Sequence, residues 1–113
     1  MLKDDFSVVA YKILKYCNEC LKCGVVPQID TAKEISKVND TYFRAVVDDL
    51  ADKRLIKRSI LYADNEPYFE SIRLTMEGAE YLNENSKMRH IAEYLGNSFI
   101  ALLKKTIDIA LNI

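Results

Sequence analysis

The sequence predicts a mainly helical α+β fold, because its hydrophobic rhythm changes twice along the chain. Apolar residues recur every three or four positions over residues 5–54, the period changes toward two over residues 56–63, and the helical spacing returns after residue 75. With 50% hydrophobic and 29% charged residues, the chain of 113 residues has the composition of a folded protein. We expect one domain over residues 1–85 and a C-terminal helix over residues 86–113 that serves packing or dimerisation.

A first helix is expected over residues 5–22, where one apolar stripe recurs at helical spacing. The members of this stripe are Phe6, Val9, Ile13, Cys17 and Leu21. Asp4 or Asp5 can cap its start, and Gly24 stands where a left-handed cap would end it. Residues 25–29 are apolar and contain a proline, so we expect a brief edge strand there.

Two closely spaced helices are expected next. Thr31 and Glu34 have the spacing of a capping box, in which each side chain bonds the backbone amide of the other residue. After a break at Asn39, Asp40 is placed to cap a third helix that ends near Arg54. The side chains expected to face inward from the third helix are Phe43, Val46, Val47 and Leu50. Two helices joined so tightly follow the plan of a helix-turn-helix.

A β-hairpin is expected after the third helix. Over residues 56–63 the period changes to two, and residues 68–74 are rich in aromatic and branched side chains. The two alternating sets are Ile56, Arg58, Ile60 and Tyr62, and Lys57, Ser59, Leu61 and Ala63. Residues 64–67, Asp-Asn-Glu-Pro, are typical of a turn. A fourth helix then begins with Thr75 as its N-cap, and Gly78 in its first turn allows close packing.

The last helix is expected to carry an apolar face wider than a two-stranded seam needs. That face consists of Met88, Ile91, Leu95, Phe99, Ile100, Leu102, Leu103, Ile107, Ala110, Leu111 and Ile113. It should pack partly on its own domain and partly on the same helix of a second chain. The residues expected to form this homodimer contact are Ile91, Leu95, Phe99, Leu102, Leu103 and Ile107. Lys104, Lys105 and Asp108 interrupt the segment, which argues against a membrane span.

The cysteine spacing is the most chemically suggestive motif. Cys17, Cys20 and Cys23 could wrap zinc or an iron–sulfur cluster, but no fourth ligand follows nearby. On a helix they spread around the circumference, so we expect Cys17 to pack as a small hydrophobe and all three to stay reduced. Acidic residues stand where a secretory signal would need a basic stretch, so a cytoplasmic location is expected.

Catalysis is not expected. His90 is the single histidine, and there is no glycine-rich phosphate loop, nucleophile elbow or histidine-containing metal motif. We therefore expect a protein that is not an enzyme, needs no metal or other cofactor, and has no evident small-molecule substrate.

The order of the expected elements is that of a winged-helix domain. Residues 62–68, Tyr-Ala-Asp-Asn-Glu-Pro-Tyr, followed by residues 74–82, Leu-Thr-Met-Glu-Gly-Ala-Glu-Tyr-Leu, resemble the YjcQ-like family of small bacterial and phage winged-helix proteins. The resemblance implies a winged helix-turn-helix with a two- or three-stranded antiparallel wing, to which this chain adds a C-terminal amphipathic helix. Members of the family are described mostly as candidate regulators or phage proteins.

DNA binding by a transcription regulator is the first functional expectation. In a helix-turn-helix the second helix enters the major groove of double-stranded DNA. The side chains expected to read bases are Thr41, Tyr42, Arg44 and Ala45. The cations expected to contact phosphates are Lys33, Lys37, Lys57 and Arg58.

Carboxylates oppose this footprint, and they keep a second expectation open. Those on the third helix and in the turn of the hairpin are Asp48, Asp49, Asp52, Asp64 and Glu66. Near phosphates, each would cost about 1 kcal/mol through water. Arg44 could instead pair with Asp40 or Asp48 at helical spacing. With a net charge of −1, the chain could also be a protein-interaction module without DNA binding. Its aromatic anchors would be Tyr42, Tyr62, Tyr68 and Phe69.

Overall fold

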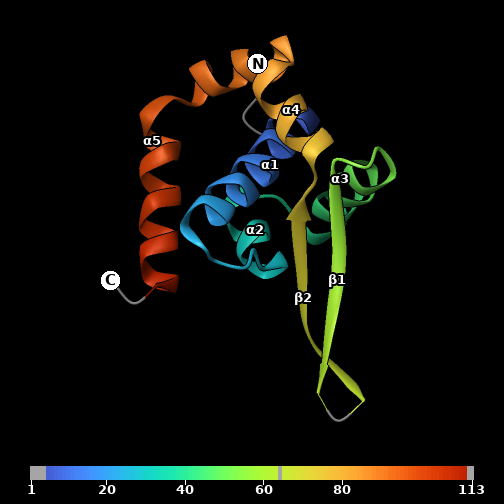
Figure 1. Cartoon of the computed structure of the whole chain (residues 1–113). Coiled ribbons are helices and arrows are strands. Elements are labelled where there is room, and N and C mark those ends of the chain that lie inside the picture. The colour runs from blue at the N-terminus through green and yellow to red at the C-terminus, as the bar shows by residue number, and fades with distance from the viewer. Residues whose placement is uncertain (1–4, 64, 112–113) are drawn as a thin grey trace.

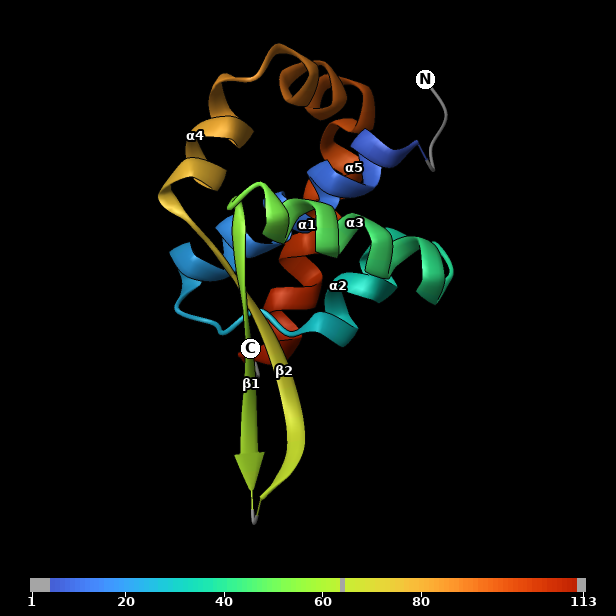
Figure 2. The same ribbon diagram turned by 90° about the vertical axis from the view of Figure 1, so that its right-hand side faces the viewer.

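The computed structural model describes residues 5–63 and 65–111, and of residues 60–63 and 66–69 it describes the backbone only. The described chain contains five helices and one antiparallel pair of strands, which confirms the mainly helical α+β class (Figure 1). In chain order the elements are α1 (Phe6–Cys23), α2 (Ile29–Ser36), α3 (Asp40–Asp52), β1 (Ile56–Ala63), β2 (Glu66–Leu74), α4 (Met76–Glu84) and α5 (Ser86–Ala110). The helices gather into one body, and the hairpin extends away from it (Figures 1 and 2).

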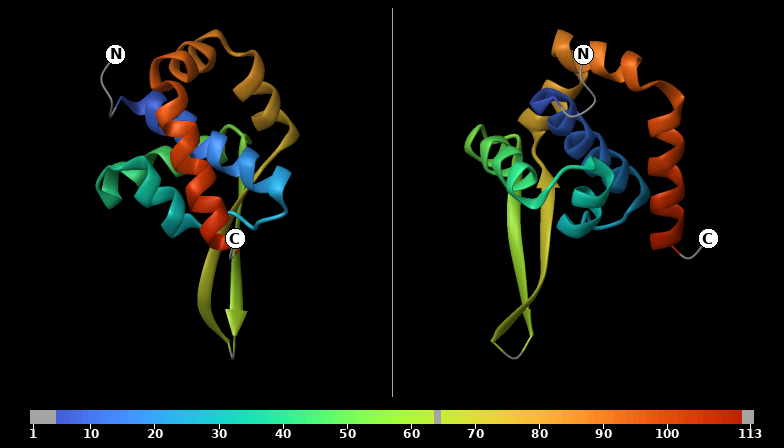
Figure 3. Two further views of the ribbon diagram at one scale, coloured as in Figure 1. Left: turned by 90° about the vertical axis from the view of Figure 1, so that its left-hand side faces the viewer. Right: turned by 180° about the vertical axis from the view of Figure 1, so that it is seen from behind.

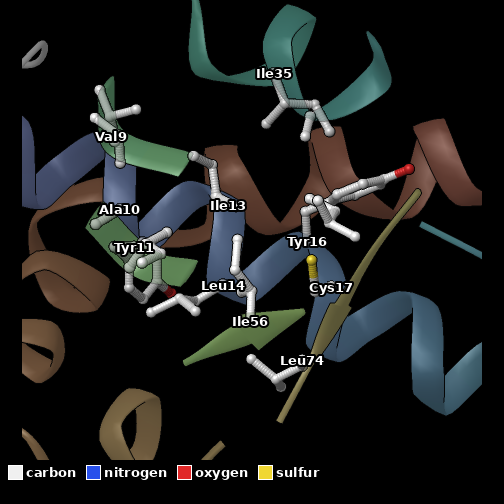
Figure 4. Packing of buried hydrophobic residues seen from close by; sticks show 14 of the residues in the cluster. Val9, Ala10, Tyr11, Ile13, Leu14, Tyr16, Cys17, Ile35, Ile56 and Leu74 are labelled. Atoms are coloured by element: carbon white, nitrogen blue, oxygen red, sulfur yellow. The ribbon is translucent and has the colours of Figure 1, made fainter. Parts of the chain in front are cut away.

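Helix α1 lies at the centre of the core. Its N-cap Asp5 accepts a hydrogen bond from the Ser7 amide at 2.9 Å, and Gly24 ends it with a φ of 74°, as predicted. The predicted single stripe is too narrow, because α2, α3, α4, α5 and β2 all pack against this helix. Figure 4 shows its side chains among those of α2, β1 and β2. The buried side chains of α1 are Val8, Val9, Ala10, Tyr11, Lys12, Ile13, Leu14, Tyr16, Cys17 and Cys20. The two ends of the predicted stripe, Phe6 and Leu21, are instead exposed.

Helices α2 and α3 meet at a tight corner, but two predicted caps are wrong. Helix α2 already begins at Ile29, which is buried, so Thr31 lies inside the helix and cannot act as its N-cap. The N-cap of α3 is Asn39, whose side-chain oxygen accepts a hydrogen bond from the Tyr42 amide at 2.8 Å. Asp40 is therefore the first residue of the helix rather than its cap, and its charge lies in the first turn.

The predicted hairpin is confirmed. Strands β1 and β2 are antiparallel, with Ile56 opposite Leu74 at the base and Ala63 opposite Glu66 near the tip. Glu66 and Pro67 belong to β2, so the turn is shorter than predicted, and Asp64 lies outside the described residues. The edge strand predicted over residues 25–29 amounts to one bridge, between Gln28 and Ser71. The described sheet therefore has two strands.

The base of the hairpin is fixed to α4 by Thr75, as its predicted role as N-cap requires. The Thr75 hydroxyl donates to the Arg54 carbonyl at 2.7 Å and accepts from the Gly78 amide at 2.9 Å. The Thr75 amide donates to the Leu55 carbonyl at 3.1 Å. A Cβ at position 78 would collide with that same carbonyl oxygen, so the close packing predicted for Gly78 is confirmed.

Helix α5 is bent at Gly96, where φ is 63° and ψ is −156°. Its second half thereby turns and runs beside α1 (Figures 1 and 3). Met88 and Ile91 before the bend, and Phe99 and Leu103 after it, join the same core cluster as α1. Residues of the expected domain, 1–85, and of the expected C-terminal helix, 86–113, thus contribute side chains to the same core. No helix in the described part of the chain has the length and apolar character that a membrane span requires.

Candidate nucleic-acid interface

Three of the predicted DNA-contacting cations lie in one chain of ion pairs, although they come from three different elements. Lys33 of α2 lies with its Nζ 3.4 Å from Asp40 Oδ1, and Arg44 of α3 lies with its Nε 3.6 Å from the same oxygen. Arg58 of β1 is linked to Arg44 through Glu70 of β2. We call Lys33, Asp40, Arg44, Glu70, Arg58 and Asp48 the ion-pair network.

Glu70 is the centre of the ion-pair network. Its Oε2 accepts from Nη1 of Arg44 at 3.2 Å, and its Oε1 accepts from Nη2 of Arg58 at 3.0 Å. Nη1 of Arg58 also donates to Asp48 Oδ1 at 2.6 Å. These contacts connect the exposed side of α3 with the base of the hairpin, which lies next to it in Figures 1 and 2. Because three cations meet three carboxylates, the network is neutral overall.

The pKa shifts of Glu70 and Arg44 favour the charged form of each group. Burial raises the pKa of Glu70, but the hydrogen bonds from Arg58 and Arg44 outweigh burial and lower the pKa below the ordinary value of 4.5. The hydrogen bond with Glu70 raises the pKa of Arg44 above its ordinary value. Both guanidinium groups therefore face an ionised carboxylate at neutral pH.

The remaining side chains of the predicted base-reading set differ in accessibility. Thr41 and Ala45 are exposed, one helical turn apart on α3. Tyr42 is partly buried, and its ring lies 6.0 Å from that of Phe6, measured between centroids. The side chain of Arg44 is 40% exposed, so it can reach solvent despite its two ion pairs. Thr41, Arg44 and Ala45 are thus the accessible members of the predicted set.

The predicted phosphate contacts do not all share one face. Lys37 is exposed at the end of α2, next to the corner with α3. Lys57 precedes Arg58 in β1, and neighbouring side chains of a strand point to opposite faces. Lys57 therefore lies on the face of the hairpin away from the ion-pair network. Lys57 and Arg58 are therefore phosphate-contact candidates on opposite faces of the hairpin.

Glu70 is the member of the network that the sequence did not reveal. Residues 68–74 indicate a strand, but the partners of a strand residue depend on register. The sequence offered one signal for Glu70, namely a carboxylate within a segment of aromatic and branched residues. Arg44 pairs with Asp40, one of the two alternatives expected, whereas Asp48 pairs with Arg58 instead.

The residues predicted for a homodimer contact are mostly buried inside this chain. Ile91, Phe99, Leu103 and Ile107 are each at most 6% exposed in the single chain, while Leu95 and Leu102 are partly buried. The bend in α5 accounts for this burial, because it folds the apolar face onto α1. A second copy can reach only the residues of α5 outside that contact, and Ile113 lies outside the described residues.

The cysteines follow the expected structural role. Cys17 and Cys20 are buried, Cys23 is exposed, and none of the three is paired in a disulfide within the described residues. Burial raises the pKa of Cys17, and it raises the pKa of Cys20 to about 11. Figure 4 shows Cys17 among the apolar side chains of α1. Within residues 5–63 and 65–111, no group of three or more His, Cys, Asp or Glu side chains is placed to hold a metal ion.

Comparison with known proteins gives a family match. The family model described as "YjcQ protein" matches residues 11–97, which reach from the first turns of α1 to just past the bend in α5. No curated protein matches the chain, and no solved structure does. The matched range covers most of the 113 residues and confirms the resemblance found in the hairpin and at the start of α4. The chain therefore belongs to the YjcQ family.

Proposed function

We propose that this chain is a winged-helix protein that binds double-stranded DNA and regulates transcription in the cytoplasm of a bacterium, as a chromosomal or phage product. It acts by binding and not by catalysis. The observation that carries the proposal is the ion-pair network, which brings Lys33, Arg44 and Arg58 from three elements onto one surface. Exposed Thr41 and Ala45 lie on α3 within one turn of Arg44.

The base-reading contacts come from the first two turns of α3. Arg44 is the side chain suited to a specific contact, because a guanidinium can donate two hydrogen bonds to O6 and N7 of one guanine. The Thr41 hydroxyl can donate to or accept from a base edge, and the Ala45 methyl can contact a thymine methyl. The second half of α3 carries Asp48, Asp49 and Asp52, so only its N-terminal half enters the groove.

The phosphate contacts come from the elements around α3. Lys33 on α2 and Lys37, its C-cap, flank the corner, and Arg58 extends the cationic side chains to the hairpin. Each ion pair in the network is partly exposed, and such pairs contribute roughly 0–1 kcal/mol, so phosphates can replace the carboxylates as partners. Because the network is neutral, nonspecific attraction is weak, and binding depends on the correct base sequence.

Selection from a random pool of duplexes tests the proposal. After enrichment, fluorescence anisotropy of the selected duplex is measured at several salt concentrations with the full chain. We expect one enriched sequence and an affinity that falls with salt by a slope of about −2 to −4, because each released phosphate contact contributes about −0.9. Failure to enrich any sequence, together with no binding at low salt, would refute DNA binding.

A homodimer through α5 remains part of the proposal, in a narrower form. After its bend, α5 still exposes the large aliphatic side chains Ile100, at 39%, and Ile109, at 67%. They are supported by the partly buried Leu95 and Leu102. A dimer would place two copies of α3 on one duplex, and two half-sites then explain a palindromic target.

A protein partner is the second candidate function, and the neutrality of the ion-pair network favours it. A surface with equal numbers of both charges suits a protein that presents the complementary pattern. Tyr94, 53% exposed on the first half of α5, offers an aromatic anchor. This candidate would be supported if the selection enriched no DNA sequence and the protein bound one host protein instead.

A further inference from the structure

The base of the hairpin carries two cations directly opposite each other. Lys57 of β1 faces Arg73 of β2, and the next pair along the same face is Ser59 opposite Ser71. Lys57 and Arg73 are both exposed. Among the described residues, no carboxylate forms an ion pair with either of them.

This arrangement is unfavourable for a hairpin on its own. Like charges directly opposite on one face of an antiparallel pair destabilise it. On the other face the cation Arg58 is matched by two carboxylates, Asp48 and Glu70. On the side of α3, the positive charge of Arg58 is thus neutralised. On the opposite side, the charges of Lys57 and Arg73 have no carboxylate partner in the described part of the chain, and two serine hydroxyl groups lie beside them.

A groove lies over these residues. Its second wall is the loop after α1, which passes the hairpin on the way to α2 (Figure 2). The groove has a volume of about 470 Å³, within the range of small-molecule sites. Leu21 and Val26 line it and are 48% and 58% exposed. Its described lining contains no carboxylate.

We propose that this groove binds a small organic anion with an apolar body, such as an aryl carboxylate or an aryl phosphate monoester. Lys57 and Arg73 provide the positive charge, and the hydroxyl groups of Ser59 and Ser71 can donate hydrogen bonds to the anionic oxygens. The apolar body covers Leu21, Val26 and their neighbours Val25 and Pro27. The ligand would remove the repulsion between Lys57 and Arg73, which supplies part of the binding free energy.

Most of the groove lies outside the proposed DNA interface. Arg58 is the one described residue that belongs both to its lining and to the ion-pair network, and the groove offers apolar contacts that a phosphate backbone does not use. A short duplex is therefore the appropriate competitor, since binding of DNA phosphates at Lys57 is the principal alternative occupant.

An amide NMR titration of the full-length ¹⁵N-labelled chain tests the proposal. The probes are phenyl phosphate and benzoate, with inorganic phosphate and benzyl alcohol as controls that each lack one half of the ligand. We expect saturable shifts at Val26, Ser59, Ser71 and Arg73, and an affinity for phenyl phosphate or benzoate at least tenfold higher than for either control. Binding of only one of the two probes identifies the anionic group.

Charge variants separate this site from nonspecific attraction. Arg73→Gln should weaken binding of the better probe at least fivefold, whereas the matched Arg89→Gln, on the exposed side of α5, should leave it unchanged. Lys57→Gln should give a loss similar to that of Arg73→Gln. The proposal is overturned if neither probe gives saturable shifts at these amides, if both charge variants bind like the unmodified chain, or if only duplex DNA shifts the same amides.

Discussion

The carboxylate of Glu70 accepts a hydrogen bond from Arg44 at 3.2 Å and so connects the second strand of the hairpin to the helix that carries the candidate base-reading residues. The side chain of Glu70 is only 20% exposed, so the contact is partly shielded from solvent. A polar link at this position fixes the orientation of Arg44 as well as that of α3. The surface proposed to contact DNA is therefore already organised in the free protein.

Acid should destabilise the protein through Glu70. A carboxyl whose pKa is lowered on folding contributes stability above its ordinary pKa and loses that contribution as the pH falls through the folded value. We expect the free energy of unfolding to fall as the pH drops below about 5, and Glu70→Gln to remove this part of the slope. At pH 7 the variant should be less stable by about 1 kcal/mol, a value reduced for the partial exposure of the site.

Urea unfolding followed by circular dichroism, at a series of pH values, measures both effects of Glu70. Glu93→Gln, at an exposed position on α5, is the matched control and should retain the slope of the unmodified chain. Parallel pH curves for the unmodified chain and Glu70→Gln would show that Glu70 is not the group that titrates.

Gly78→Ala should destabilise the fold strongly, although alanine is the better helix former. The added Cβ would collide with the Leu55 carbonyl oxygen and lie 2.8 Å from Cδ1 of Leu74. The backbone at Leu55 is held by the Thr75 amide and cannot move freely. We expect a loss of about 1–3 kcal/mol from overpacking, measured by thermal or urea unfolding. A more stable Gly78→Ala variant would contradict this tight junction.

Gly96→Ala should disturb the packing of the last helix. The backbone at Gly96, with φ of 63° and ψ of −156°, lies in a region that only glycine occupies readily, so alanine costs on the order of 1–3 kcal/mol. No atom would touch the new methyl group, so the cost comes from the backbone alone. Amide hydrogen exchange should show lost protection after residue 96, while the hairpin keeps its protection. Unchanged exchange would mean that the bend does not depend on glycine.

The two kinds of DNA contact should respond differently to mutation. Arg44→Ala should cost about 1–3 kcal/mol on the selected duplex and relax the preference at one base pair. Lys33→Ala should weaken binding to all sequences and reduce the salt slope by about 0.9. Anisotropy titrations measure both, with Arg89→Ala and Lys105→Ala on α5 as matched controls. Equal losses from Arg44→Ala and Lys33→Ala on every sequence would argue against base reading.

Light scattering tests the homodimer. We expect a mass of twice 13.0 kDa for the unmodified chain and of one chain for Ile109→Asp, whose exposed side chain takes little part in the core. Leu95→Asp or Leu102→Asp should also give single chains, but at the cost of stability, because both side chains pack against the core. A single-chain mass for the unmodified protein at high concentration would rule out the dimer.

Local signals in the sequence predict most of the fold. The change from helical spacing to alternation indicates the hairpin, and Thr75 and Gly24 mark helix ends because their capping depends on nearby backbone groups. The start of α2 could not be predicted in this way, because burial of Ile29 extends the helix ahead of the capping box at Thr31. Tertiary packing therefore overrides the local preference there.

The candidate site could be predicted only in part. The residue types suggested that Lys33, Arg44 and Arg58 act together, and the structure brings them together. The role of Glu70 depends on strand register and on the distance between α3 and the hairpin, neither of which a periodic pattern specifies. For the same reason the opposition of Lys57 and Arg73 became visible only once the two strands were aligned.

The bend at Gly96 also determines which molecule covers α1. The second half of α5 reaches that helix because the chain bends at this glycine. If the bend opened, the second half of α5 and the surface of α1 that it covers would still be complementary. They could then pair within one chain or between two neighbouring chains. We therefore expect variants that disturb this bend to exchange their C-terminal segments between copies at high protein concentration.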